Sequence, residues 1–429
     1  MKYNYVYLKC LFTYFFVLFS YVICAQTLNN TIYYDAVKSI TIVNTDNTNP
    51  YPHINLHSTQ QLNVEFDILE DDLRSLQYTL IHCTENWEKS DISKNDYIEI
   101  IGNALDIDTY RVSVNTTLNY VHYEFSFPNQ EIKFKISGNY ILRVTDMNLD
   151  DQILFEKRII VYESNLPIDM EIKRASIVEF MDCYHEIDFS IYINSTELDN
   201  PFDNLHATLL QNGRWDNART NVKPLYSKSD VLIFDHEREN IFKAGNEFRL
   251  INFKSFSYQT ERIEKYRYEN KQWNVYLFSD QVRKYKIYRQ EDDLNGRLYI
   301  ATDNRQIAKT EGEYASVHFF LPYDIVELDG DIYIYGELSN WQINDQFKMN
   351  YNTDKLQYEH TLLLKQGYYD YQYVYVDRKT NIIDNTFIEG CFYQTENDYN
   401  IIVYTKDRIN NYDRIIGYKL GNSNKNNGN

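Results

Sequence analysis

Residues 331–377 contain the strand pattern that most limits how this chain can fold. Tyrosine occupies every second position from Tyr369 to Tyr375, and Gln372, Val374 and Val376 each follow one of these tyrosines. Successive side chains of a β-strand point to opposite faces, so this alternation predicts a strand with four tyrosines on one face. With an earlier strand and a Gly-Glu-Leu-Ser-Asn-Trp turn, it predicts a small β-sandwich that presents a surface and has no catalytic pocket.

Similar short runs recur along nearly the whole chain, separated by turns rich in Asn, Asp, Gly and Pro. Short strands with such turns are typical of β-sandwiches, so we predict an all-β protein of tandem immunoglobulin-like or early-set β-sandwich domains. One helical turn is expected at 93–98. The expected parts are a signal peptide at 1–25, an N-terminal sandwich at 26–165, a middle sandwich at 166–290, a C-terminal early-set-like sandwich at 291–418, and a disordered tail at 419–429.

The first 25 residues indicate the compartment. Lys2 and Lys9 precede an apolar run from Cys10 to Cys24, and Ala25 supplies the small residue of a signal-peptidase site. This run is shorter than the roughly 20 apolar residues of a membrane-spanning helix, and no later segment is apolar enough to span. We therefore expect an exported, periplasmic chain with no transmembrane segment after cleavage. Acylation of Cys24 is the less favoured alternative.

Charge and cysteine content narrow the classes of partner. The formal net charge is −19, which argues against nucleic acid and anionic membrane surfaces as partners. The 41 tyrosines accompany scarce Gly and Pro, a composition typical of AT-rich genomes, so they are weak evidence for aromatic recognition. Cys83, Cys183 and Cys391 follow the signal peptide. One bridge among them is an option, but separate buried thiols are the favoured interpretation.

The sequence contains none of the common catalytic, phosphate-binding or dinucleotide-binding motifs. His82 is better explained as a hydrogen-bonded structural histidine than as a catalytic base. Residues 146–150 imitate the start of a calcium loop, but Asp151 stands where that loop needs Gly and Lys157 where it needs a bidentate Glu. We therefore predict a protein that is not an enzyme, with no catalytic residues, no metal and no cofactor.

Short motifs in all three expected domains together resemble one known family. They are Tyr-Thr-Leu-Ile-His-Cys-Thr-Glu-Asn-Trp at 78–87, Ser-Gly-Asn-Tyr at 137–140, Gln-Asn-Gly-Arg-Trp-Asp-Asn-Ala at 211–218, Gly-Asn-Glu-Phe-Arg at 245–249 and Thr-Glu-Asn-Asp-Tyr at 395–399. In this order they resemble the plug protein of the type IX secretion system of Bacteroidota. The resemblance implies a non-catalytic periplasmic plug. Such a plug binds the large outer-membrane β-barrel translocon at its inner face and seals the pore when no substrate is exported.

Five residues are candidates for partner contact or for structural roles. Trp87, Trp215 and Trp341 can each be a core anchor or an exposed contact. Asn340 and Asp345 are expected to form turns in the polar loops near Trp341. We expect the translocon interface in the loops that flank the tryptophans, with the acidic surface facing a more basic rim of the barrel.

The third expected domain also resembles early-set sandwiches of α-glucan-binding modules. The resemblance is carried by Gly336-Glu-Leu-Ser-Asn-Trp341, by Gly367-Tyr-Tyr-Asp-Tyr and by Asp377. It implies the alternative of an exported carbohydrate-binding protein, which requires Trp341 to be exposed on a concave aromatic face. A free periplasmic chaperone for cargo is a third hypothesis.

Overall fold

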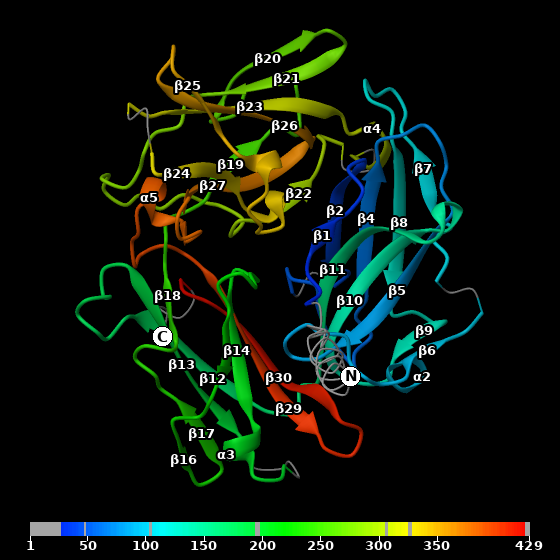
Figure 1. Ribbon diagram of the computed structural model, residues 1–429, viewed down its shortest axis with the longest axis vertical. Helices are drawn as coiled ribbons and strands as arrows, with labels where there is room; N and C mark the ends of the chain where they lie inside the picture. The colour runs from blue at the N-terminus through cyan, green and yellow to red at the C-terminus, as the bar shows by residue number, and fades with distance from the viewer. Residues whose placement is uncertain are drawn as a thin grey trace, which may run out of the picture.

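The computed structural model describes residues 27–46, 49–102, 105–193, 198–304, 308–324 and 328–424. Nearly all of its regular structure is β, which confirms the predicted fold class. The strands form three two-sheet sandwiches, seen in Figure 1 as three lobes. We call them the first module (residues 31–162), the second module (168–243 with 398–422) and the third module (249–389). Within the described residues, no helix has the length and apolar character to cross a membrane.

The first module buries one core between its two main sheets. One sheet has the order β1 (Thr31–Ile32), β11 (Gln152–Tyr162), β10 (Gly138–Asp146), β5 (Leu76–Cys83), with β3 (His53–Asn55) parallel to β11. The facing sheet has the order β2 (Val37–Asn44), β4 (Leu62–Ile68), β8 (Val121–Phe127), β7 (Tyr110–Val112). The expected helical turn is confirmed as α2 (Lys94–Tyr97), next to the pair β6 (Ile98–Ile100) and β9 (Ile132–Phe134), and η1 (Met147–Leu149) follows β10.

The second module is closed by strands from the end of the chain. Its first sheet has the order β12 (Ile168–Arg174), β13 (Tyr184–Tyr192), β17 (Val231–Phe234), β16 (Tyr226–Lys228), with β18 (Ile241–Lys243) also on β13. Its other sheet has the order β15 (Arg219–Val222), β14 (His206–Gln211), β29 (Asp398–Asp407), β30 (Tyr412–Asn422), and α3 (Pro201–Asn204) precedes β14. The pairing of β14 with β29 joins Gln211 to Tyr399, so this sheet forms only when the chain returns.

In the sequence, the third module lies between the two segments that form the second module. One sheet pairs β27 (Gly367–Asp377) with β19 (Arg249–Asn252), β22 (Leu298–Ile300), β24 (Gly330–Tyr335) and β28 (Ile383–Asp384). The other has the order β20 (Ile263–Glu269), β21 (Gln272–Leu277), β23 (Tyr314–Pro322), β26 (Gln357–Lys365), β25 (Asn350–Asn352). Its short helices are α4 (Ala308–Glu311), η2 (Glu337–Ser339), η3 (Asp345–Phe347) and α5 (Thr386–Glu389).

Strand pairing crosses two of the boundaries expected from sequence. β19, β20 and β21 precede residue 290 but pair within the third module, and β30 continues to Asn422, into the expected tail. Local strand patterns carry no information on which distant strand completes a sheet, so the return of β29 and β30 escapes sequence reading. The expected signal peptide at 1–25 and residues 425–429 lie outside the described part of the chain.

The tyrosine-rich strand β27 supplies core, in contrast to the surface that its pattern suggested. Tyr369, Tyr371 and Tyr373 are buried in the third module's core, on one face as predicted. Their hydroxyls are not left without partners. Tyr371 and Tyr373 donate to Asp280 at 2.6 and 2.9 Å, and Tyr369 donates to the carbonyl oxygen of Lys365 at 2.6 Å. A buried tyrosine is tolerated when its hydroxyl finds an acceptor, so alternation alone does not identify the exposed face.

Cys183 and Cys391 form a disulfide, with their Cα atoms 5.0 Å apart. The preference for separate buried thiols was therefore wrong for this pair. The two residues are 208 positions apart, and they meet because the chain re-enters the second module after residue 390. Cys83 is a buried free thiol, and burial raises its pKa to about 12, which makes it a poor nucleophile.

The double substitution Cys183→Ser, Cys391→Ser is expected to lower the free energy of unfolding by about 2–4 kcal/mol, because the unfolded chain loses a constraint between distant residues. Thermal melting with and without reductant measures the effect. Reductant should bring the wild-type melting temperature down to that of the double variant, and Cys83→Ala should keep this response. A wild-type melting temperature that ignores reductant would contradict the structural role of the bridge.

Candidate partner surfaces and the junction of the three modules

Trp87 and Trp215 join the first module to the second. Trp87 follows β5 and is 3% exposed, and its ring meets that of Trp215 edge to face, with centroids 4.8 Å apart. Trp215 comes from the loop between β14 and β15 and is half-buried. The guanidinium of Arg158, on β11, lies 4.5 Å from the Trp87 ring centroid. Burial lowers the pKa of Arg158 to about 10, so the group stays cationic at neutral pH. The rings and the cation hold the two modules together.

Trp341 packs where the third module meets the second. It is half-buried, with its ring edge-on to Tyr335 and Phe248, at centroid distances of 5.5 and 5.9 Å. The guanidinium of Arg214, from the second module, lies 4.6 Å from its centroid. Gly296 has φ +81°, and a β-carbon there would stand 2.2 Å from the Trp341 ring, so only glycine fits beneath it. The ring is thus covered, not displayed on the concave aromatic face that carbohydrate binding requires.

Asn340 and Asp345 have different surroundings. The Asn340 side-chain oxygen accepts a hydrogen bond from the ammonium of Lys157, which belongs to the first module. Asp345 begins η3 and is exposed. The structure therefore brings Trp87, Trp215, Trp341 and Asn340 to contacts between modules and leaves Asp345 at the surface. A role in partner contact stays a prediction for all five.

A cavity of about 80 Å³ lies among these residues. Its lining includes Tyr51, His53, Lys157, Trp215 and Trp341, drawn from all three modules. Sites for small ligands usually occupy about 300–1,000 Å³, so this void is too small for a sugar. We interpret it as a packing gap at the junction.

A buried ion pair joins the first module to the third. The Lys365 ammonium lies 2.7 Å from the Asp67 carboxylate, and both side chains are 1% exposed. Tyr314 and His122 complete the environment of Asp67, with Tyr314 donating its hydroxyl at 2.7 Å and His122 Nδ1 at 2.8 Å. Burial tends to raise the pKa of Asp67, but Lys365 and His122 lower it below its ordinary value overall. Lys365, Tyr314 and His122 Nδ1 all contact the Asp67 carboxylate, so the cluster joins the first module to the third.

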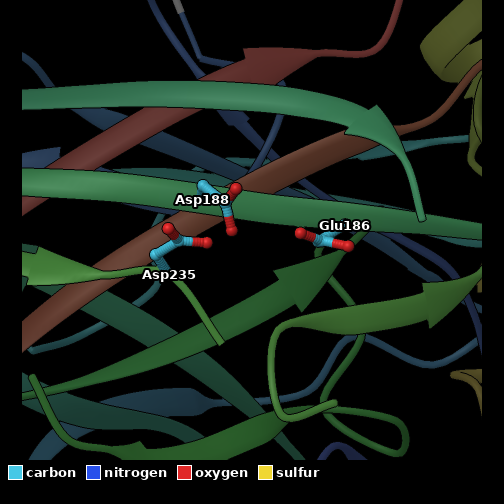
Figure 2. Close-up of side chains that lie close together, drawn as sticks. All are labelled: Glu186, Asp188 and Asp235. Carbon is cyan, nitrogen blue, oxygen red and sulfur yellow. The ribbon is translucent and has the colours of Figure 1, made fainter. Parts of the chain in front are cut away.

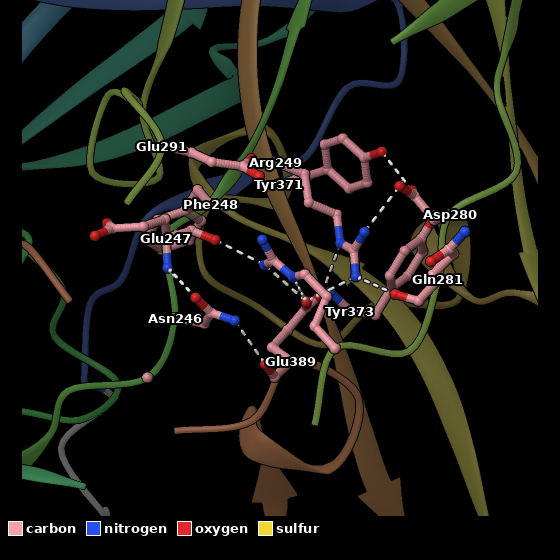
Figure 3. A network of polar contacts seen from close by, with 12 residues as sticks. Asn246, Glu247, Phe248, Arg249, Asp280, Gln281, Glu291, Tyr371, Tyr373 and Glu389 are labelled. Carbon is pink, nitrogen blue, oxygen red and sulfur yellow. Dashed lines mark hydrogen bonds and ion pairs between the residues drawn. The ribbon is translucent and has the colours of Figure 1, made fainter. Parts of the chain in front are cut away.

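A second buried network lies inside the third module (Figure 3). Arg249 makes two bonds to Glu389, at 3.0 and 2.8 Å, and one to Asp280 at 2.8 Å. Arg283 donates to Glu389 at 2.7 Å, and so does the backbone N–H of Tyr373 at 2.9 Å. Burial alone would raise the pKa of Glu389, but Arg249 and Arg283 lower it to about 2. All four carboxylate oxygens of Glu389 and Asp280 have donors, so the network offers no free acid or base for catalysis.

Glu186, Asp188 and Asp235 form a cluster of carboxylates in the second module (Figure 2). Their nearest oxygens lie within 4.8 Å of one another. The Lys173 ammonium already fills the position of a cation, at 2.5 Å from Asp188 and 3.2 Å from Glu186. Burial raises the pKa of Asp188 to about 6, although Lys173 opposes this. Lys173 supplies one positive charge against the three carboxylates. The prediction of no bound metal remains a prediction.

His82 and the calcium-like loop at 146–150 both make internal contacts that explain their residues. His82 is buried, with Nδ1 2.7 Å from Ser90 Oγ and Nε2 3.3 Å from the carbonyl oxygen of Ser137. Burial lowers its pKa to about 4, so it is neutral at physiological pH. Asp146, at the start of the calcium-like loop, pairs with Arg74 at 2.5 Å. Its carboxylate is thereby committed to an internal cation.

A basic segment between β21 and β22 is the surface feature that sequence analysis missed. We call residues 283–289 the basic strap. Tyr285 and Ile287 are 87% and 95% exposed, and Lys284, Lys286 and Arg289 beside them are also exposed. Its signal in the sequence is four basic residues within seven positions of a strongly acidic chain. Exposed aromatic and aliphatic side chains with a charged rim are typical of protein-binding surfaces.

Comparison with known proteins identifies the relatives. Residues 37–163, nearly all of the first module, match the family described as Type 9 secretion system plug protein 1st domain. The fold is similar to a crystal structure of a hypothetical protein from Parabacteroides merdae ATCC 43184. The TM-score is 0.87 and the identity 30%, over 92% of this chain and 100% of that one. A search of curated proteins gives no match.

Proposed function

Because this chain belongs to the type 9 secretion system plug protein family, we propose that it binds the large outer-membrane β-barrel translocon of that system and seals its pore. The family associates the chain with type IX secretion and with the cell envelope. The further steps are part of the proposal: a signal peptide that is cleaved, a position at the inner face of the outer membrane, and a role without catalysis.

The observation that supports sealing is the way the three modules are joined. The Asp67–Lys365 ion pair, the Trp87–Trp215 contact and the Arg214–Trp341 contact connect each module to another. A barrel wide enough for folded cargo has an aqueous lumen, and a cap for it must keep its shape. Three sandwiches joined through buried contacts meet this requirement better than beads on flexible linkers would.

We propose the basic strap as one place of contact with the translocon. Tyr285 and Ile287 would bury apolar surface, and the adjacent lysines would pair with acidic groups of the partner. Elsewhere, the acidic surface expected to face a basic rim would steer approach over longer distances, an effect that added salt should weaken.

The test is a pull-down from native outer membranes with the mature protein tagged at its C-terminus. We expect recovery of one very large β-barrel protein in near-equal amount, and less of it when cargo is trapped in the pore. Tyr285→Ser with Ile287→Ser should reduce recovery at least about tenfold, equivalent to 1.4 kcal/mol. Ile409→Ser, at a position 93% exposed in another module, is the matched control.

Sealing needs its own measurement. Cells that lack the protein should take up large antibiotics normally excluded by the outer membrane, and the wild-type gene should restore exclusion. Recovery of no barrel, or retention on α-glucan resin instead, would refute the plug proposal. Equal recovery with the strap variant would refute only the strap as the contact.

A further inference from the structure

A cleft of about 350 Å³ lies between the first and third modules. The first module contributes β1, β2 and Lys157 of β11, and the third contributes β22, η2 and β26. Its volume falls within the range of about 300–1,000 Å³ typical of ligand sites. Apolar side chains cover much of its surface, among them Val37, Ile40, Ile300, Leu364 and Tyr369.

Two strand edges border this cleft. β25 pairs with β26 only at Gln357–Glu359, so within the described residues the edge from His360 to Leu364 has no neighbouring strand. β22 is likewise the outer strand beside β27. Unpaired strand edges are templates for an added strand, because their backbone N–H and C=O groups lack partners.

The cleft also contains Lys157, which forms no direct ion pair within the described residues. Lys157 is half-buried, and its only hydrogen bond among the described residues is to the side-chain oxygen of Asn340. An ammonium carries three donors, so two remain available. Burial lowers the pKa of Lys157 to about 8, partly opposed by Glu337, so it is mostly protonated at neutral pH. The carboxylate of Glu337 is engaged with the backbone N–H of Leu298 at 2.8 Å.

The remaining charged groups of the cleft balance one another, since Lys38 and Lys157 are matched by Asp35 and Glu337, so Lys157 is a local positive group in a cleft without net charge. Lys38 lies on the first-module wall and forms no ion pair in the described chain. Burial lowers the pKa of Lys38, and the nearby negative charge of Asp35 raises it by a smaller amount. Asp35 is exposed and accepts a bond from Gln346. Lys365 also lines the cleft but is paired with Asp67.

We propose that this cleft binds an extended peptide segment that carries a carboxylate, with the segment adding a strand to the β26 edge and its carboxylate meeting Lys157. The apolar walls accept the alternate side chains of such a strand, and the edge accepts its backbone. This site lies apart from the basic strap, and its assignment does not rest on the plug role.

Fluorescence anisotropy with labelled hexapeptides tests the assignment. The probe is Thr-Val-Glu-Val-Thr-Val, compared with a Gln-for-Glu version and with a version in which proline replaces both inner valines. We expect the Glu peptide to bind at least about tenfold tighter than the other two. Lys157→Met should abolish the preference for Glu over Gln, and Lys133→Met, at an exposed position of the first module, should keep it.

Hydrogen exchange locates the peptide independently of affinity. Backbone amides within residues 360–364 should gain protection when the Glu peptide is added. Lys157→Met removes a desolvated charge, so the melting temperature of this variant should not fall. An unchanged melting temperature shows that a loss of peptide binding is not a loss of folding. Equal affinity for the Glu and Gln peptides, or no new protection at 360–364, would overturn the proposal. Lys157-dependent binding of decanoate without peptide binding would also overturn it, in favour of a fatty acid.

Discussion

Arg249→Met is expected to lower the free energy of unfolding by about 3–5 kcal/mol, because it leaves the buried carboxylates of Glu389 and Asp280 without their shared cation. Urea denaturation followed by tryptophan fluorescence measures the loss. Arg267→Met is the matched control, since Arg267 pairs with Glu269 at the surface with more than half of its side chain exposed. Such pairs contribute about 0–1 kcal/mol, so the control should stay close to wild type.

Arg249→Met should also change how the free energy of unfolding depends on pH. The pKa of Glu389 is lowered to about 2, so its contribution to stability is present above its ordinary pKa and is lost as pH falls toward 2. Without Arg249, burial is the larger effect and should raise this pKa. The difference in stability between wild type and Arg249→Met should therefore shrink from pH 7 to pH 4. A difference that is constant over this range would contradict the assigned role of Glu389.

Lys365→Met is expected to cost about 3–5 kcal/mol, because the Asp67 carboxylate stays buried between two modules without its cation. Adding Asp67→Asn should recover part of the loss, since a neutral amide is less costly to bury than an unpaired carboxylate. Lys355→Met is the control, as Lys355 forms an exposed pair with Glu359. If the effects of Lys365→Met and Asp67→Asn simply add, the two residues are not coupled and the ion pair does not hold the modules together.

The sequence predicted local structure better than it predicted assembly. Alternation along β27 predicted both the strand and its tyrosine face, because side-chain direction follows from backbone geometry alone. The same pattern did not show that this face is core. Burial of Tyr371 and Tyr373 depends on Asp280, which accepts both hydroxyls from about 90 positions away. Nothing in a strand's own residues specifies such a partner.

The candidate site shows the same limit. From the sequence, each tryptophan can be either a core anchor or an exposed contact residue. The structure places them at contacts between modules, where Arg158 and Arg214 lie over the rings. Those arginines come from distant segments, so the pairings had no signal in the sequence. The basic strap does have a signal in the sequence, a local run of positive charge in an acidic chain.

The placement of β29 and β30 has a consequence for the order in which the molecule can be built. During synthesis the first strands of the second module emerge before the third module, yet β29 and β30, which complete its sheet, are made only after the third module. The edge of β14 that pairs with β29 therefore stays unpaired until the whole third module has been made. A premature stop just before residue 398 would remove both β29 and β30. The second module, made long before that position, would then keep an unpaired edge on β14, and the third module would remain attached to an incomplete sandwich.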